Sequence, residues 1–218
     1  MLERFREFWT KVWAPLGDLL LRMGVSPNTV TVVGTLGVCA GALIFFPQGW
    51  LLAGVVVITA FVFSDMIDGY MARTSGQISP FGAFLDSTLD RIGEGALFAG
   101  LAHYFYTTAS GGSVWFRGNL EGSARWGDPN GQTLAVLSLA TLILAFLVSY
   151  TRARAEGLGL ECKVGIMERP ERLLTLAAGA LLGPRFLPGV LGILFLLTLV
   201  TVLQRVYHVR RLTRTPAP

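Results

Sequence analysis

Four aspartates lie close together in an otherwise apolar part of this 218-residue chain. Asp65 and Asp68 are i and i+3, and Asp86 and Asp90 are i and i+4, so each pair would share one face of a helix. An ionised aspartate at the centre of a membrane helix costs roughly 2.5–3.5 kcal/mol, and four unpaired ones would cost on the order of 10 kcal/mol. Divalent cations can offset that cost, and carboxylates suit Mg²⁺, Mn²⁺ or Ca²⁺ rather than zinc. Because paired metals commonly hold a phosphoryl group during displacement, the cluster predicts a metal-bound phosphate or pyrophosphate.

Two glycines accompany the aspartates. Gly69 directly follows Asp68, and Gly82 lies one turn before Asp86. A glycine leaves room for a ligand to approach the backbone. The alternative is that both glycines are contacts between packed helices. Beside four carboxylates we favour the first interpretation.

Long apolar helices must position these side chains. The chain is 52% hydrophobic and only 15% charged, with a mean hydropathy of +0.57, which suits a membrane protein better than a soluble domain. A helix needs about 20 apolar residues to cross a bilayer. We therefore predict an all-α integral membrane protein with the polar loop 107–131. Its six transmembrane helices are expected at residues 29–47, 51–71, 83–106, 132–151, 170–184 and 187–207.

The first 20 residues have a different pattern. Phe5, Phe8, Trp9, Val12 and Trp13 recur at helical spacing among charged residues, and no signal peptide is indicated. We predict that 1–20 form an amphipathic helix in the membrane surface. The alternative is the first turns of a buried helix. The whole chain, 1–218, is expected to be one domain, in which 26–212 form the six-helix catalytic bundle.

The basic residues indicate an orientation. With the N-terminus in the cytoplasm, only Arg117, Arg125 and Arg185 of the 18 lysines and arginines fall on the far side. This bias predicts a multi-pass protein of the plasma membrane. Both termini and the aspartates would then lie on the cytoplasmic side.

The spacing of the aspartates and glycines resembles a known signature. D-x-x-D-G-x-x-A-R, then eight residues, then G-x-x-x-D-x-x-x-D is similar to that of the CDP-alcohol phosphotransferase family, and all eight fixed positions are present. The resemblance implies a six-span enzyme that releases CMP from a CDP-linked lipid and joins the phosphatidyl group to an alcohol. It also implies two Mg²⁺ or Mn²⁺ ions per site, held by Asp65, Asp68, Asp86 and Asp90. Asp90 would in addition be the general base that acts on the acceptor hydroxyl.

The same resemblance implies contacts to CDP-diacylglycerol. The stretch SPNTVT, residues 26–31, is similar to the family element before the first span. An alternative is a simple helix start, with Asn28 as the cap and Pro27 at its edge, and both interpretations can hold together. The residues implied to contact the nucleotide lipid are Asn28, Thr29, Val30, Thr31, Asp68, Gly69, Arg73, Ser79 and Gly82.

Arginines near the cytoplasmic ends of the last three spans point to a second phosphate. Arginine forks match phosphate oxygens, although positive-inside charge, lipid headgroups or pairing with Glu156, Glu168 and Glu171 are alternatives. The patterns S-Y-x-R-A-R-A-E and E-R-P-E-R resemble the actinobacterial branch of the family that makes phosphatidylinositol phosphate. In that branch the acceptor is inositol 1-phosphate (1D-myo-inositol 3-phosphate). The implied acceptor-phosphate residues here are Arg152, Arg169, Arg172 and Arg205.

Other functions remain open at this point. Glycerol 3-phosphate as the acceptor also needs a second phosphate site. An archaeal-type ether lipid as the donor is a further alternative, because the sequence does not specify the lipid tails. A transporter would need charges at the midplane of several spans, and a scaffold would not need the aspartates at all. The expected partners are the two substrates and the lipid bilayer, with no nucleic acid. A homodimer is expected from the resemblance.

Overall fold

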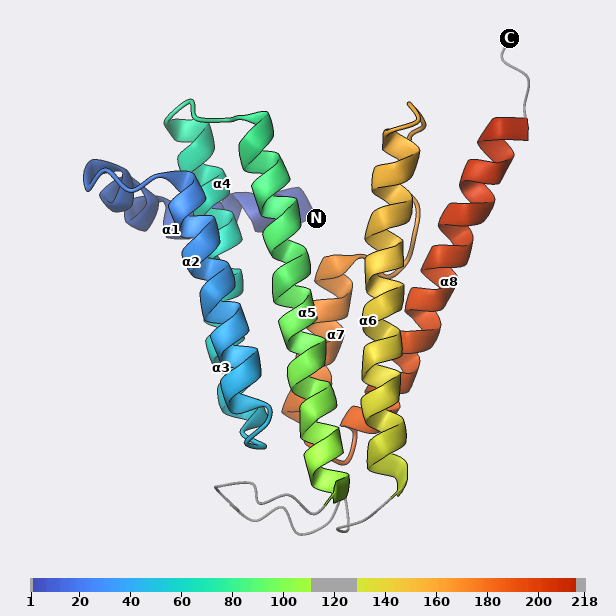
Figure 1. Ribbon diagram of the computed structural model, residues 1–218. Coiled ribbons are helices and arrows are strands. Elements are labelled where there is room, and N and C mark those ends of the chain that lie inside the picture. Colours follow the sequence, from blue (N-terminus) through green and yellow to red (C-terminus); the bar gives the residue numbers. More distant parts are fainter. Residues whose placement is uncertain (1, 111–128, 215–218) are drawn as a thin grey trace. The chain divides into compact units, whose positions relative to one another are not determined.

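The computed structural model describes residues 2–110 and 129–214, and all regular elements within these ranges are helical. The predicted all-α fold is therefore confirmed (Figure 1). The elements are α1 (Leu2–Arg22), α2 (Pro27–Ala40), the π-helix η1 (Gly41–Phe45), α3 (Leu51–Val62), α4 (Ser64–Thr74), α5 (Pro80–Ser110), α6 (Pro129–Glu156), α7 (Arg169–Leu182) and α8 (Leu187–Arg214).

Four helical segments of the described residues are long and apolar enough to cross a membrane. They are Pro27–Phe45, Leu51–Thr74, Gly131–Glu156 and Leu187–Arg214, and they match the first, second, fourth and sixth predicted spans.

The other two predicted spans correspond to α5 and α7, and the count of six is not confirmed. The 31-residue α5 carries a charged first half, while α7, with 14 residues, is only about 21 Å long. A bilayer core is about 30 Å thick. Most of the predicted polar loop 107–131, with Arg117 and Arg125, lies outside the described residues.

The chain forms two compact units, of which the first contains Met1–Phe45 and Ala53–Leu97. In this unit α1 runs across α4 and contacts it, and α2 lies along α4 (Figure 1). The ring centroids of Trp13, in α1, and Phe63, directly before α4, are 5.8 Å apart. A Cβ atom on Gly34 would lie only 1.8 Å from Ser64 Oγ, so glycine is what allows α2 to pack this closely on α4.

The turn after α4 directs the chain back toward the aspartates. Gly76 has a φ of +69°, and the Gln77 amide donates to the Ala72 carbonyl at 3.0 Å, which is a glycine-terminated helix end. Pro80 then begins α5 at a position that needs no backbone donor. This short connection places the first turns of α5 near α4, as the sequence predicted.

The second unit contains Phe46–Leu52 and Phe98–Pro218. Helix α8 packs against both α6 and α7. Its inward face is lined by Leu187, Leu191 and Leu194, which are fully buried. At its C-terminal half the same helix buries a charged side chain, that of Arg205.

Candidate functional site

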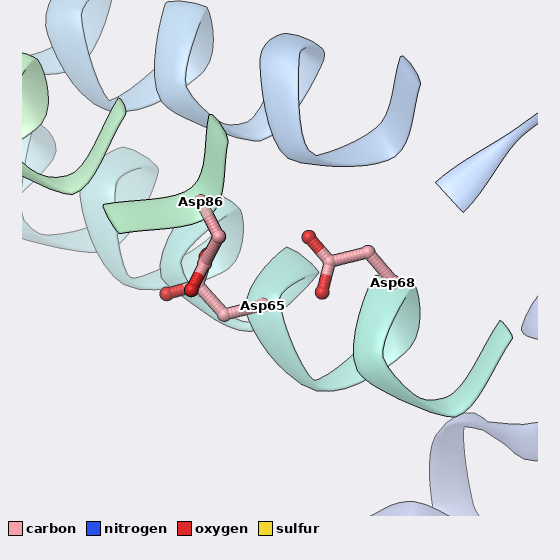
Figure 2. Close-up of side chains that lie close together, drawn as sticks. All are labelled: Asp65, Asp68 and Asp86. Atoms are coloured by element: carbon pink, nitrogen blue, oxygen red, sulfur yellow. The ribbon is translucent and has the colours of Figure 1, made fainter. Parts of the chain in front are cut away.

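Three of the four predicted metal ligands meet in the first unit. One carboxylate oxygen from each of Asp65, Asp68 and Asp86 lies within 4.8 Å of the others. Figure 2 shows these carboxylates turned toward one another, two from α4 and one from α5. Asp68 is buried, Asp65 is half-buried and Asp86 is exposed. The cluster is thus anchored in the protein at one end and accessible at the other.

The donor set of this cluster fits a hard divalent cation. At an effective dielectric constant of about 20, two unit charges 4.8 Å apart repel by about 3 kcal/mol, so three ionised carboxylates strongly favour a bound cation. All three ligand atoms are carboxylate oxygens, which Mg²⁺ and Mn²⁺ prefer. The arrangement could therefore hold a metal ion, as the spacing predicted.

Asp68 is held by a hydroxyl from another helix. Thr31 Oγ1, on α2, donates to Asp68 Oδ2 at 2.6 Å, and both residues are buried. Thr31 was predicted to contact the nucleotide lipid. In the structure its hydroxyl is directed at a predicted metal ligand.

Asp90 lies one turn beyond Asp86 on α5 and is not part of the group of three. Its Oδ2 lies 3.4 Å from Arg91 Nη2, and 16% of its side chain is exposed. Its roles as a fourth ligand and general base remain predictions. One turn further on, Glu94 is 1% exposed. No role was predicted for Glu94, although its i+4 spacing from Asp90 indicates that the acidic face of the helix continues.

Three of the predicted nucleotide contacts converge at the start of α5. A Cβ atom on Gly82 would lie 3.3 Å from Ser79 Oγ and 3.4 Å from Asn28 Oδ1. The Gly82 amide donates to Ser79 Oγ at 3.0 Å, so Ser79 also caps α5. The absence of a side chain at Gly82 thus lets polar groups from two separate segments approach the same backbone.

Gly69 and Arg73 form a second such pair on α4. A Cβ atom on Gly69 would lie 3.3 Å from Arg73 Nη1, which means that the guanidinium extends over the glycine. Arg73 is exposed. A cation beside bare backbone and close in sequence to Asp68 is suited to binding a phosphate.

The start of α2 corrects one of the two interpretations of SPNTVT. Ser26, not Asn28, caps this helix, because Ser26 Oγ accepts a hydrogen bond from the Thr29 amide at 3.2 Å and Pro27 occupies the first turn. The Asn28 side chain is therefore directed elsewhere, toward Gly82. Thr29 and Val30 line a largely apolar cavity of about 520 Å³ beside α1, α3 and α4.

The predicted acceptor-phosphate arginines lie in the second unit, and Arg205 is the most constrained of them. It is 2% exposed. Its Nε donates to the Val164 carbonyl at 2.8 Å, its Nη1 to the Val148 carbonyl, and its Nη2 to Glu168 Oε1 at 2.7 Å. Arg205 therefore joins α8 to α6 and to the loop before α7.

The remaining three arginines surround the same loop. Arg172 is also 2% exposed, and its Nη1 donates to the Met167 carbonyl at 2.9 Å. Arg152 pairs with Glu156 at 2.9 Å and lies 4.0 Å from Glu168. Arg169 begins α7. The pairing of arginines with Glu156 and Glu168, left open from the sequence, is confirmed.

The contacts that hold this loop against α8 were not predicted from the sequence. Thr201 Oγ1 accepts from the Met167 amide at 3.1 Å. A Cβ atom on Gly165, whose φ is +137°, would lie 2.5 Å from Thr201 Cγ2. A threonine in an apolar helix gives no sequence signal for such a contact, because its partner is 34 residues away.

Comparison with known proteins identifies relatives along nearly the whole chain. The model of the family described as CDP-alcohol phosphatidyltransferase matches residues 24–204. A phosphatidylinositol phosphate synthase from Streptomyces avermitilis is 44% identical over 97% of this chain and 83% of its own length. One from Cutibacterium acnes is 43% identical over 97% of this chain and 98% of its own length.

Solved structures of a third relative have a similar fold. The phosphatidylinositol phosphate synthase of Mycobacterium tuberculosis with CDP-DAG bound is 35% identical, with a TM-score of 0.77 over 91% of this chain and 94% of that one. The same enzyme in complex with manganese and citrate is 37% identical, with a TM-score of 0.75 over 89% of this chain and 87% of that one.

Proposed function

Because this chain belongs to the CDP-alcohol phosphatidyltransferase family, we propose that it is a membrane phosphatidylinositol phosphate synthase. It would transfer the phosphatidyl group of CDP-diacylglycerol to inositol 1-phosphate (1D-myo-inositol 3-phosphate), giving phosphatidylinositol phosphate and CMP. The observation that carries this proposal is the convergence of Asp65, Asp68 and Asp86, in a chain whose relatives of 43–44% identity over 97% of its length bear that name.

The acidic cluster would hold two divalent ions, Mg²⁺ or Mn²⁺. When bound, such ions would neutralise charge on the diphosphate of the donor and on the departing CMP. Asp65, Asp68 and Asp86 would be ligands, and Asp90 would complete the set from the next turn of α5. A solved relative was crystallised with manganese, which supports the use of a divalent metal.

The reaction exchanges one phosphorus–oxygen bond for another. A hydroxyl oxygen of the acceptor would attack the phosphorus that carries diacylglycerol, and the bond from that phosphorus to the CMP oxygen would break. Asp90 would accept the hydroxyl proton. Its place one turn after Asp86 supports this role, because a base must lie within reach of the reacting oxygen.

The donor would bind beside α2, α4 and the start of α5. Asn28, Ser79 and Gly82 would contact the nucleotide, and the Arg73 guanidinium over Gly69 would contact the diphosphate. Thr29 and Val30 line an apolar cavity whose character suits the lipid part of the donor. Thr31, whose hydroxyl donates to Asp68, would also contact the donor.

The acceptor phosphate would bind Arg152, Arg169, Arg172 and Arg205. These arginines could bind any acceptor that carries a phosphate, so glycerol 3-phosphate is the alternative to inositol 1-phosphate. Inositol 1-phosphate is preferred because of the similarity to phosphatidylinositol phosphate synthases over nearly the full chain.

The chain would be a single domain that crosses the plasma membrane six times, with α5 and α7 as the third and fifth spans. Asp86 and Asp90 would then lie at the cytoplasmic end of α5, together with both chain termini. Helix α1 would lie in the cytoplasmic membrane surface, and its contact with α4 supports a position beside the metal-binding helix. The active form would be a homodimer.

The direct test is to incubate the purified protein with labelled CDP-diacylglycerol, Mg²⁺ and each candidate acceptor in turn, and to measure CMP release. We expect release with inositol 1-phosphate, and none after chelation of the metal. If CMP were released only with glycerol 3-phosphate, the proposed acceptor would be wrong, but the proposed class of reaction would stand. An absence of CMP release with every acceptor would contradict the proposed activity.

A further inference from the structure

The hydroxyl of Thr31 has two possible acceptors and one proton. It lies 2.6 Å from Asp68 Oδ2 and 3.1 Å from the carbonyl oxygen of Pro27, one turn earlier in its own helix. A hydrogen bond to a carboxylate is shorter and stronger than one to a neutral carbonyl. The proton is therefore directed mainly at Asp68, which lies 37 residues further along the chain.

The hydrogen bond between Thr31 and Asp68 is buried. Thr31 is 7% exposed and Asp68 is 8% exposed, so little water competes for either group. Among the three clustered aspartates, Asp68 is the buried one. The hydrogen bond from Thr31 restricts the rotation of this carboxylate and engages one of its two oxygens, so the other could serve as a metal ligand.

We propose that Thr31 is a positioning residue that holds Oδ2 of Asp68 and thereby presents the Asp68 carboxylate to the metal. This inference rests on the metal centre of the proposed function. It differs from a nucleotide contact by Thr31, because it requires the hydroxyl before any nucleotide binds. Groups that orient a metal ligand typically contribute 10- to 100-fold to metal affinity or activity.

Helix α2 itself offers a matched control. Thr35 lies one turn after Thr31, and its Oγ1 donates to the Thr31 carbonyl at 3.0 Å, within the same helix. Thr35→Val therefore makes the same chemical change as Thr31→Val without touching a carboxylate. Thr31→Ser retains the hydroxyl and removes only the methyl group.

The experiment measures Mn²⁺ binding to the purified full-length protein without nucleotide, from the loss of the free Mn²⁺ signal in electron paramagnetic resonance. We expect Thr31→Val to raise the Kd for Mn²⁺ about 10-fold or more. Thr31→Ser and Thr35→Val should remain within about threefold of the wild type, since each keeps the donor to Asp68. In assays, Thr31→Val should need more metal for half-maximal rate and recover much of its kcat at saturating Mn²⁺.

Several outcomes would overturn the inference. One is a Thr31→Val protein that binds Mn²⁺ like the wild type, including one whose only defect is a raised KM for CDP-diacylglycerol. Another is a Thr31→Ser protein as impaired as Thr31→Val. If Thr31→Val does not fold, Thr31→Ala, which places no methyl group against Asp68, is judged by the same criteria. A wild-type protein that binds no Mn²⁺ would overturn the metal centre as well, whereas the other outcomes leave it intact.

Discussion

Arg205 of α8 donates a hydrogen bond from Nη2 to Glu168 Oε1 at 2.7 Å, while its own side chain is only 2% exposed. Arg205 also donates hydrogen bonds to the carbonyls of Val148 and Val164, which lie in the same unit. Arg205, which the sequence predicted to bind a phosphate with pairing to a glutamate as an alternative, therefore fixes the loop before α7.

Replacing Arg205 with lysine should destabilise the protein even in the absence of substrate. An ammonium group has no planar fork and cannot reach all three acceptors, and a hydrogen bond to a charged group contributes about 1.5–3 kcal/mol. We expect the free energy of unfolding to fall by about 3 kcal/mol, measured by thermal unfolding in detergent. Arg210→Lys, at an exposed position of the same helix, is the control and should have little effect. An unchanged midpoint for Arg205→Lys would mean that these bonds contribute nothing net.

Glu168→Gln should increase the affinity for the acceptor. The Glu168 carboxylate is 40% exposed and faces both Arg205 and Arg152, so it opposes an incoming phosphate by charge. Glutamine can still accept the bond from Arg205 but carries no charge. We expect the KM for inositol 1-phosphate to fall several-fold, with a larger effect at low salt. A raised KM would instead indicate that the carboxylate is needed to hold the arginines in place.

Gly82→Ala should impair the use of CDP-diacylglycerol without unfolding the protein. The new methyl group would lie 3.3 Å from Ser79 Oγ, which must move by a few tenths of an ångström, and 3.4 Å from Asn28 Oδ1. We expect the KM for the donor to rise and the thermal midpoint to stay close to that of the wild type. Gly93→Ala, on the same helix, meets only Val38 at the ordinary distance of 3.5 Å and should behave like the wild type. Equal kinetics for both variants would argue against a nucleotide site at Gly82.

Asp90→Asn should separate proton transfer from metal binding. Asp90 lies outside the group formed by the other three aspartates, so we expect Mn²⁺ affinity to fall less than in Asp68→Asn. If Asp90 is the general base, turnover at saturating metal should drop by about 10²–10⁴. Near-normal turnover with normal metal binding would exclude that role. A loss of Mn²⁺ affinity as large as that of Asp68→Asn would make Asp90 primarily a ligand.

Much of the acidic site could be predicted from the order of the residues. The i, i+3 spacing of Asp65 and Asp68 places them on one helical face whatever the rest of the chain does, because the geometry of a helix is local. The five residues between α4 and α5 force the chain to return nearby, which brings Asp86 within reach. The apolar runs likewise predicted four of the candidate spans, whose starts lie within two residues and whose ends lie within seven residues of the predicted ones.

The limits of prediction appear where a residue has two possible partners. Asn28 and Ser26 are both good helix caps by type, and only the folded backbone shows that Ser26 takes that position. Arg205 is basic near a predicted membrane face, and its sequence context cannot distinguish a free phosphate ligand from a buried hydrogen-bond donor. The outcome depends on partners in α6 and in the loop before α7, 37 to 57 residues away.

The order of the residues was enough to predict a metal-binding chemistry, because carboxylates at helical spacing within apolar segments can be stabilised there by divalent cations. Which groups lie beside those carboxylates, and at what distance, follows only from how the helices pack. Thr31 is directed at Asp68, and Asp90 is set apart from the other three aspartates, because α2, α4 and α5 pack at particular separations. Those separations depend on close contacts between helices, such as that of Gly34 with Ser64, which no local pattern of residues specifies.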